Sequence, residues 1–149
     1  MPNANRIAVL HGVNLEQLGG RDPLFYGDFT LTELERQIEG WAHELGLETT
    51  SFQTNHEGEF VEHLHRLRGT ADGAILNPGS WTHYSWAIRD ALELTGVPAV
   101  EVHISDVMAR EEWRHVSVFD GLVVGRVYGK GAEGYREALR ILAEHLEKG

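Results

Sequence analysis

Glu101 and His103 could form an acid–base pair. They stand two residues apart in an apolar segment, and side chains at positions i and i+2 of a strand point to the same face. A carboxylate beside an imidazole orients the ring and raises its pKa, which suits a general acid. An isolated E-x-H pattern is more often a buried structural pair, so these two residues alone leave both interpretations open.

A tyrosine that could act as a base lies in the long segment 12–28. About 17 residues exceed the usual length of a βα loop, and long loops in compact domains are often lids with glycine hinges such as Gly19 and Gly20. Tyrosine titrates near pH 10, so Tyr26 is a base at neutral pH only where cations favour the phenolate. From spacing alone, a solvated loop tyrosine is the expected case. Cations that could change this are Arg21, Arg110 and Arg114.

The hydrophobic pattern predicts the scaffold for these residues. Apolar runs predict strands at 6–11, 48–53, 73–77, 99–104 and 122–127. Segments with helical period follow them, near 30–45, 60–67, 86–95, 108–114 and 135–147. Thr30 and Glu33 have the capping-box spacing at the start of the first helix. Alternating strands and helices predict an α/β fold with a five-stranded parallel sheet, and near-continuous apolar strands indicate helices on both faces.

Polar residues follow the predicted strands. In open parallel sheets, ligands bind beyond the carboxyl ends of the strands, so these side chains should gather at one edge. Any one of them could be an ordinary turn residue. Together they predict a site at that edge, formed by Asn14, Asn55, His56, Asn77, Pro78, Gly79, His83, Glu101, His103, Ser105, Arg110 and Arg114.

Composition limits the class of protein. A chain of 149 residues predicts one domain over residues 1–149, and its lack of cysteine excludes disulfides and thiolate metal sites. A formal charge of −10 argues against nucleic acid as the main partner. With neither a signal-like segment nor about 18 consecutive apolar residues, we expect a soluble, cytoplasmic protein with no membrane partner.

Two patterns suggest binding functions that the rest of the sequence does not support. Residues 129–134 form a G-x-G-x-x-G, but too little chain follows for a dinucleotide-binding unit, so we expect a tight strand-to-helix turn. Nine histidines suggest metal binding, yet His63 and His65 do not share a helix face, and no H-E-x-x-H occurs. We expect no metal, and we expect His43, His63 and His145 to lie at the surface.

Four segments of the chain carry a longer pattern: HGVNLEQLGGRDPLFYG, FQTNHEGEFVEHLH, ILNPGSWTHYSWAIRDAL and VPAVEVHISDVMAREEWRH. In order and spacing they resemble the type II 3-dehydroquinate dehydratases, and the match runs from Ile7 nearly to the C-terminus. The resemblance implies a flavodoxin-like three-layer sandwich and a homododecamer built as a tetramer of trimers. It also implies dehydration of 3-dehydroquinate to 3-dehydroshikimate, by anti elimination through an enolate and without cofactor or metal.

The resemblance also implies a role for each matching residue. Tyr26 would remove the proton alpha to the ketone, and Arg21 would close the lid and help keep Tyr26 ionised. Asn14, through a water, would stabilise the enolate, and His103, supported by Glu101, would protonate the departing hydroxyl. Substrate would be held by Asn77, Ile104 and Ser105 at its carboxylate, by His83 and Arg114 at ring hydroxyls, and by Asp90 of a neighbouring subunit.

Some positions depart from the family pattern, and none of them carries an assigned chemical role. They are His11, Val13, Glu16, Gln17, Tyr84, Trp86, Asp106 and Val116. Two alternatives therefore stay open. The chain could dehydrate a related cyclic hydroxy-ketone acid, or it could be a catalytically weak relative that binds or assembles. Retention of all five residues with implied catalytic roles argues against the second.

Overall fold

Five parallel strands form the centre of the computed structural model, which describes residues 4–149. The strands are β1 (Arg6–His11), β2 (Glu48–Gln53), β3 (Gly73–Asn77), β4 (Ala99–His103) and β5 (Gly125–Tyr128). Their order across the sheet is β2-β1-β3-β4-β5, and every neighbouring pair is parallel. This is the strand order of flavodoxin-like folds. The predicted fold class is confirmed.

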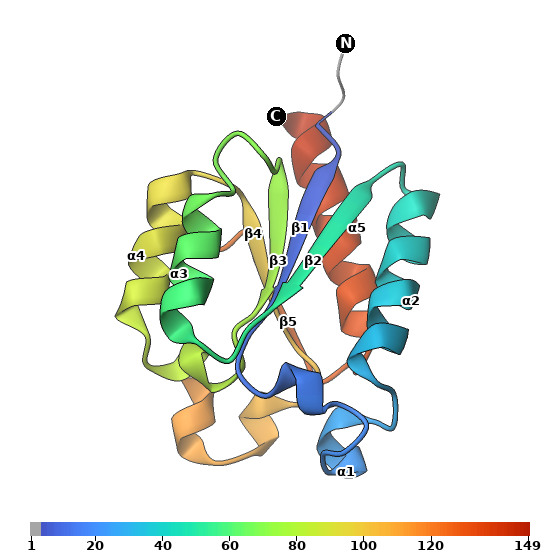
Figure 1. Ribbon diagram of the computed structural model, residues 1–149, viewed down its shortest axis with the longest axis vertical. Helices are drawn as coiled ribbons and strands as arrows, with labels where there is room; N and C mark the ends of the chain where they lie inside the picture. The colour runs from blue at the N-terminus through green and yellow to red at the C-terminus, as the bar shows by residue number, and fades with distance from the viewer. Residues whose placement is uncertain (1–3) are drawn as a thin grey trace.

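Four helices cover the two faces of the sheet (Figure 1). On one face lie α2 (Leu31–Glu44) and α5 (Glu133–Lys148), and on the other lie α3 (Glu57–His65) and α4 (Trp86–Thr95). Alternate strand residues point to opposite faces, so each strand contributes to two cores. Val9 packs against α2 and α5, whereas its neighbour Leu10 packs against α3 and α4.

Local signals set the ends of the helices. Thr30 accepts a hydrogen bond from the Glu33 N–H, and the Glu33 carboxylate accepts one from the Thr30 N–H, which completes the predicted capping box of α2. Gly96 ends α4 in the left-handed region, with φ 67°. No helix in residues 4–149 is both long and apolar enough to cross a membrane.

The structure corrects three predicted strands. β5 begins at Gly125 rather than at 122, because Leu122 and Val123 both donate to the Phe119 carbonyl in a turn. Their side chains are still partly buried against the α3–α4 core, which explains the apolar pattern without a strand. β4 ends at His103, one residue early. β2 lies at the edge of the sheet and is largely exposed, so not every strand is buried on both faces.

The predicted helix at 108–114 is two short 3-10 helices, η3 (Val107–Ala109) and η4 (Glu112–His115). Arg110 separates them in an extended conformation, with φ −116° and ψ −161°. Asp106 caps η3 by accepting a hydrogen bond from the Met108 N–H at 3.1 Å. The break leaves Arg110 between two turns at the carboxyl edge of the sheet.

Segment 12–28 folds into two short helices rather than an irregular loop. They are η1 (Leu15–Gln17) and α1 (Pro23–Tyr26), and Asp22 caps α1 by accepting from the Leu24 N–H at 3.0 Å. Leu15 and Leu18 anchor the first part in the core between the sheet and α2. Leu24 in the second part is 83% exposed, so the end that carries Tyr26 projects from the body.

Candidate active site

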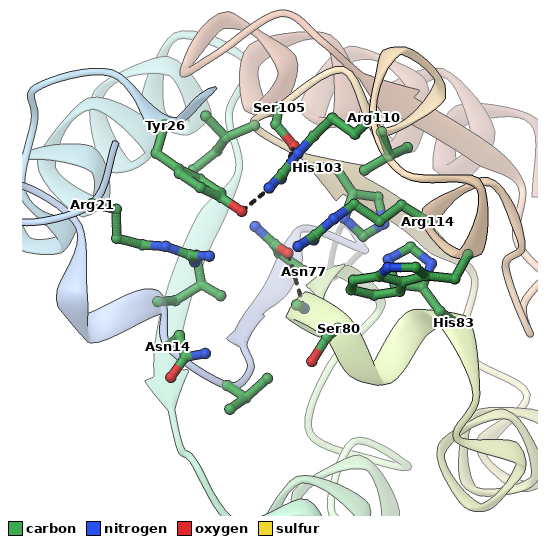
Figure 2. Close-up of a pocket in the computed structure, with 16 residues that line it drawn as sticks. Asn14, Arg21, Tyr26, Asn77, Ser80, His83, His103, Ser105, Arg110 and Arg114 are labelled. Atoms are coloured by element: carbon green, nitrogen blue, oxygen red, sulfur yellow. Dashed lines mark hydrogen bonds between the residues drawn. The ribbon is translucent and has the colours of Figure 1, made fainter. Parts of the chain in front are cut away.

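The carboxyl ends of the strands surround a cavity of about 210 Å³ (Figure 2). Of the predicted site residues, Glu101 lies directly behind the wall, Asn55, His56 and Pro78 do not line the cavity, and Asp90 lies elsewhere. Trp113, which was not predicted, also lines the cavity. The predicted residues that line it are Asn14, Arg21, Tyr26, Asn77, Gly79, His83, His103, Ile104, Ser105, Arg110 and Arg114.

Glu101 and His103 form a buried pair. His103 Nε2 lies 2.5 Å from Glu101 Oε2, and the Glu101 side chain is fully buried. Burial alone would raise the pKa of the Glu101 carboxyl, but the hydrogen bond and charge of His103, together with the charge of Arg126 and a hydrogen bond from Thr82, lower it to about 2. Glu101 is therefore a carboxylate at neutral pH, and it orients the imidazole toward the cavity.

Two hydroxyl groups and a guanidinium complete the surroundings of Glu101. Thr82 Oγ1 donates to Oε2 at 2.6 Å, and Ser117 Oγ donates to Oε1 at 2.7 Å. Arg126 Nε lies 3.3 Å from Oε1. These three partners were not predicted, because they come from separate segments and no local pattern links them to Glu101.

Tyr26 reaches the cavity from α1 between two arginines (Figure 2). Arg110 Nη1 donates to the Tyr26 hydroxyl oxygen at 2.7 Å. The Arg21 guanidinium carbon lies 3.6 Å from the centroid of the Tyr26 ring. Two positive charges therefore adjoin the phenol, and their field favours negative charge on its oxygen.

Arg110 connects Tyr26 to the body of the protein. The same Nη1 that contacts Tyr26 also donates to Ser105 Oγ at 3.1 Å, just beyond β4. Arg110 was predicted to lie at this edge and to be one of three cations that could favour the Tyr26 phenolate, but it was given no catalytic or binding role of its own. Its position after a strand predicted that it lies at the carboxyl edge of the sheet. Its contact with Tyr26 was not predictable in this way, because it depends on the extended backbone between η3 and η4.

Asn14 occupies a constrained position at the start of η1. With φ 71° it is the one residue other than glycine with positive φ in the part of the chain that the structure describes. Asparagine tolerates this conformation better than most residues. The Asn14 N–H donates to Asn55 Oδ1 at 2.8 Å, which fixes the backbone while the side chain lines the cavity.

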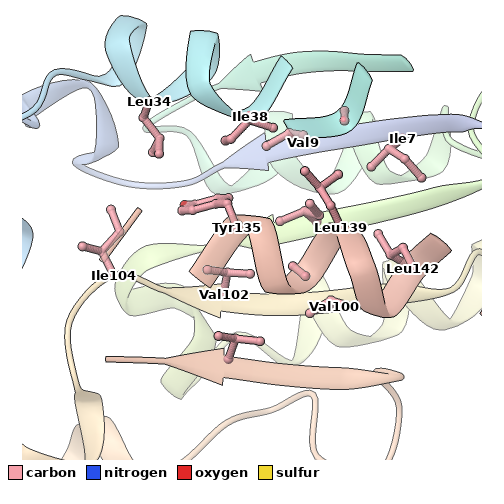
Figure 3. Close-up of a cluster of buried hydrophobic side chains, with 14 of the residues drawn as sticks. Ile7, Val9, Leu34, Ile38, Val100, Val102, Ile104, Tyr135, Leu139 and Leu142 are labelled. Atoms are coloured by element: carbon pink, nitrogen blue, oxygen red, sulfur yellow. The ribbon is translucent and has the colours of Figure 1, made fainter. Parts of the chain in front are cut away.

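Asn77 is held from below by the core. Its Nδ2 donates to the Tyr135 hydroxyl at 3.0 Å, and its Oδ1 accepts from the Gly79 N–H at 3.2 Å. Tyr135 is fully buried on α5, among the side chains that α2 and the strands contribute (Figure 3), and burial raises the pKa of its phenol above the ordinary value. One Asn77 N–H remains for a ligand.

His83 and Arg114 form the far wall of the cavity. His83 Nδ1 lies 2.7 Å from the Val116 carbonyl oxygen, so Nδ1–H donates there and Nε2 is free. Burial lowers the pKa of His83, so its ring favours the neutral form. Arg114 lies over the Trp113 ring at 4.1 Å and donates from Nε to Glu111 at 3.1 Å.

Close backbone contacts bring the β1 and β3 loops together. A Cβ atom on Gly12 would lie 2.3 Å from the Pro78 carbonyl oxygen, and one on Gly79 would lie 2.7 Å from the Val13 carbonyl oxygen. Gly79 also has φ 66°. Glycine at both positions lets the loop that carries Asn14 approach the end of β3 that carries Asn77.

Asp90 does not reach this cavity. It lies exposed on α4, beside Glu93 and Leu94. The G-x-G-x-x-G segment forms the predicted turn before α5, where the Gly129 and Gly131 N–H groups donate to the carbonyls of Ser105 and Ile104. Of the histidines predicted at the surface, His43 and His145 are exposed, whereas His63 is half-buried with its ring stacked on Phe52 at 4.0 Å.

The arrangement suits proton transfer on a small polar ligand. A phenol beside two cations and an imidazole backed by a carboxylate face one cavity, which supplies a candidate base and a candidate acid. Within residues 4–149, no group of three or more His, Asp or Glu side chains is arranged to hold a metal ion. Fold and site together define a flavodoxin-like α/β protein with a candidate acid–base centre at the carboxyl edge of its sheet.

Comparison with known proteins identifies the family. Residues 5–143 match the model of the family described as dehydroquinase class II. The chain is 47% identical over 145 residues to a 3-dehydroquinate dehydratase of Pelobacter propionicus, covering 97% of each protein. It is 52% identical over 134 residues to one of Thermotoga neapolitana, covering 90% of this chain and 91% of that protein.

Solved structures agree with this comparison. The type II dehydroquinase from Propionibacterium acnes superimposes with a TM-score of 0.90 at 39% identity, covering 97% of this chain and 99% of the other. That from Butyrivibrio crossotus gives 0.89 at 38% identity, covering 93% and 97%. The chain belongs to the class II dehydroquinase family.

Proposed function

We propose that this protein is a hydro-lyase that converts 3-dehydroquinate to 3-dehydroshikimate by anti elimination through an enolate. One observation carries the proposal. In a chain of this family, a phenol between two arginines and a buried carboxylate–imidazole pair face the same cavity (Figure 2). Relatives that share nearly half of the sequence carry the name of this activity.

Tyr26 acts as the base in this mechanism. Its phenolate takes the proton alpha to the ring ketone, and the electron pair of the broken C–H bond moves into the enolate. Arg110, 2.7 Å from the phenol oxygen, and Arg21, stacked on the ring, stabilise the phenolate before the transfer. Asn14, through a water, stabilises the charge that develops on the ketone oxygen.

His103 acts as the acid. The enolate electrons re-form the ketone as the new ring double bond forms, and the hydroxyl leaves as water with the proton from His103. Glu101 holds the imidazole for this transfer at 2.5 Å. Tyr26 on α1 and His103 on β4 both face the cavity, and anti elimination requires that they act on opposite faces of the ring.

Binding groups surround this centre. Asn77, with one free N–H, and the backbone at Ile104 and Ser105 hold the substrate carboxylate, and His83 and Arg114 bind ring hydroxyls. We include in the proposal a homododecamer built as a tetramer of trimers, in which Asp90 of a neighbouring subunit completes the site. The exposed position of Asp90 on α4 is compatible with that contribution.

The test is turnover of purified 3-dehydroquinate without added metal or nucleotide, followed by the ultraviolet absorbance of the conjugated enone product. We expect turnover that a chelator leaves unchanged and that His103→Gln strongly reduces. His43→Gln, at an exposed histidine of α2, is the matched control and should keep wild-type rates. A folded wild-type protein without turnover would refute the proposal and favour another ring ketone acid or a binding role.

A further inference from the structure

Arg126 is an unassigned cation next to the acid side of the site. It lies on β5 directly opposite Glu101 of β4 in the sheet register. Its Nε is 3.3 Å from Glu101 Oε1, and its side chain is 19% exposed. Arg126 does not line the cavity, so any effect it has on the reaction must pass through Glu101.

The Arg126 guanidinium is held mainly by the charge of Glu101. Among residues 4–149, Glu101 is the only carboxylate within ion-pair distance of it. Its Nε and Nη2 atoms are buried, and neither has a hydrogen-bond partner in that part of the chain. A buried cation with so few hydrogen bonds is unfavourable unless a nearby anion compensates it, and Glu101 is that anion.

The two oxygens of Glu101 serve different partners. Oε2 accepts from Thr82 and contacts His103, whereas Oε1 accepts from Ser117 and faces Arg126. When His103 gives up its proton, Glu101 stays ionised, because it remains paired with Arg126. Without that cation, proton donation would leave a buried carboxylate whose partners are all neutral, namely two hydroxyls and the Nε2–H of the imidazole, which is costly.

We propose that Arg126 is a positioning residue that neutralises Glu101 and thereby makes His103 a stronger acid. This inference rests on the proposed function, in which His103 protonates the departing hydroxyl. Arg126 lies behind the Glu101 carboxylate and balances its negative charge both before and after the proton leaves His103. The imidazole can therefore release its proton and recover it without leaving Glu101 as an unpaired charge in the core.

Other charged groups face the same imidazole. The His83 ring on the 3-10 helix η2 (Gly79–His83) lies 6.1 Å from the His103 ring, and Arg114 on η4 adjoins His83 across the cavity wall. These groups stay in place when Arg126 changes. A change in the pH profile that is specific to Arg126 therefore reports the pairing with Glu101.

The experiment measures kcat and KM for 3-dehydroquinate against pH in wild type, Arg126→Met and Arg126→Lys. In Arg126→Met, the unneutralised Glu101 retains the imidazole proton more strongly. We expect the basic limb of kcat to move up by about one pH unit and the maximal kcat to fall about tenfold, with KM unchanged. Arg126→Lys keeps the positive charge, so the basic limb of its kcat–pH profile should stay at the wild-type pH.

Arg6→Met is the matched control. Arg6 pairs with Asp72 at 3.1 Å at the opposite edge of the sheet, so its loss removes an arginine–carboxylate pair far from the cavity and should leave the pH profile unchanged. Arg126→Gln is the second neutral variant if Arg126→Met does not fold. A purely structural role would lower yield or stability without moving the basic limb.

The outcomes separate the two proposals. An active wild type with an unmoved basic limb in the neutral variants would overturn the role of Arg126 alone. The role of Arg126 would also be overturned if the basic limb of kcat shifts as far in Arg126→Lys as in Arg126→Met. A wild type that is folded but inactive on 3-dehydroquinate would overturn the proposed function, and the role of Arg126 in it would fail with it.

Discussion

The site has two halves built in opposite ways. The half proposed to supply the acid, Glu101 and His103 (the acid half), lies on a central strand, and its carboxylate is fully buried among four partners. The half proposed to supply the base, Tyr26 and Arg21 (the base half), lies on segment 12–28, whose outer end is exposed. Arg110 joins the halves by donating to both Tyr26 and Ser105.

The difference indicates how stability and activity are divided in this fold. A charge fixed in the core is well oriented, but it couples the reaction to the stability of the sheet, because losing a partner strands a buried ion. The phenol on α1 is only partly buried against the core, and a short helical turn of this kind can move to admit substrate. We therefore expect substitutions in the acid half to affect both stability and turnover, and substitutions in the base half to affect turnover alone.

Glu101→Gln tests the acid half and should have the largest effect on stability. The substitution leaves Arg126 and His103 beside a neutral amide, so the free energy of unfolding should fall by about 3 kcal/mol and kcat should drop as well. Denaturant unfolding at pH 7 measures the first quantity. Glu33→Gln, on the surface of α2, is a control expected to cost much less, and equal losses in the two variants would contradict the account.

The pH dependence of Glu101 follows from its lowered pKa. A carboxyl group whose pKa is about 2 in the folded protein, against 4.5 ordinarily, contributes stability that is present above pH 4.5 and is lost as pH falls toward 2. The stability difference between wild type and Glu101→Gln should therefore be constant near neutral pH and shrink below pH 4.5.

Arg110→Met tests the connection between the halves. It removes the donor to the Tyr26 oxygen and one of the two adjacent positive charges. The activation barrier should therefore rise by about 2 kcal/mol, which lowers kcat roughly thirtyfold. Steady-state kinetics measure the loss, with Arg140→Met on the exposed face of α5 as control. An unchanged kcat would mean that Tyr26 does not depend on Arg110.

His11→Asn tests the layer beneath the site and should have the smallest effect. Burial lowers the pKa of His11 to about 4, so the unfolded chain binds a proton more readily and wild-type stability falls as pH drops from 6.5 toward 4. Glu35, 3.5 Å from His11 Nε2, favours the imidazolium, but burial outweighs it. Wild type should lose about 1.8 kcal/mol more than His11→Asn between pH 7 and pH 5 in denaturant unfolding, and parallel curves would contradict this.

Much of the fold follows from local sequence patterns. β1, β2 and β3 have the predicted bounds, because glycine, asparagine and capping residues mark their ends. β5 was placed three residues early, because Leu122 is as apolar as a strand residue although its backbone turns at Phe119. An apolar sequence pattern indicates that side chains are buried, but it does not distinguish a buried turn from a buried strand.

The site was less predictable than the fold. Two arguments predicted that Asn77, His83 and His103 lie at one edge of the sheet: ligands bind at the carboxyl ends of parallel strands, and the sequence resembles the family. The structure places all three residues around one cavity. The partners that tune Glu101 were not predictable, because Thr82, Ser117 and Arg126 are neighbours only in the folded chain. The functional roles of the site residues stay predictions.

The central claim is that Tyr26, on the exposed half, is the base for elimination from 3-dehydroquinate. The direct test compares wild type and Tyr26→Phe by enone absorbance, with substrate affinity and unfolding measured in the same preparations. The account predicts a fall in kcat of about a thousandfold with nearly unchanged affinity and unfolding free energy. Wild-type turnover in Tyr26→Phe would contradict it, and so would a loss of activity that merely follows a loss of folding.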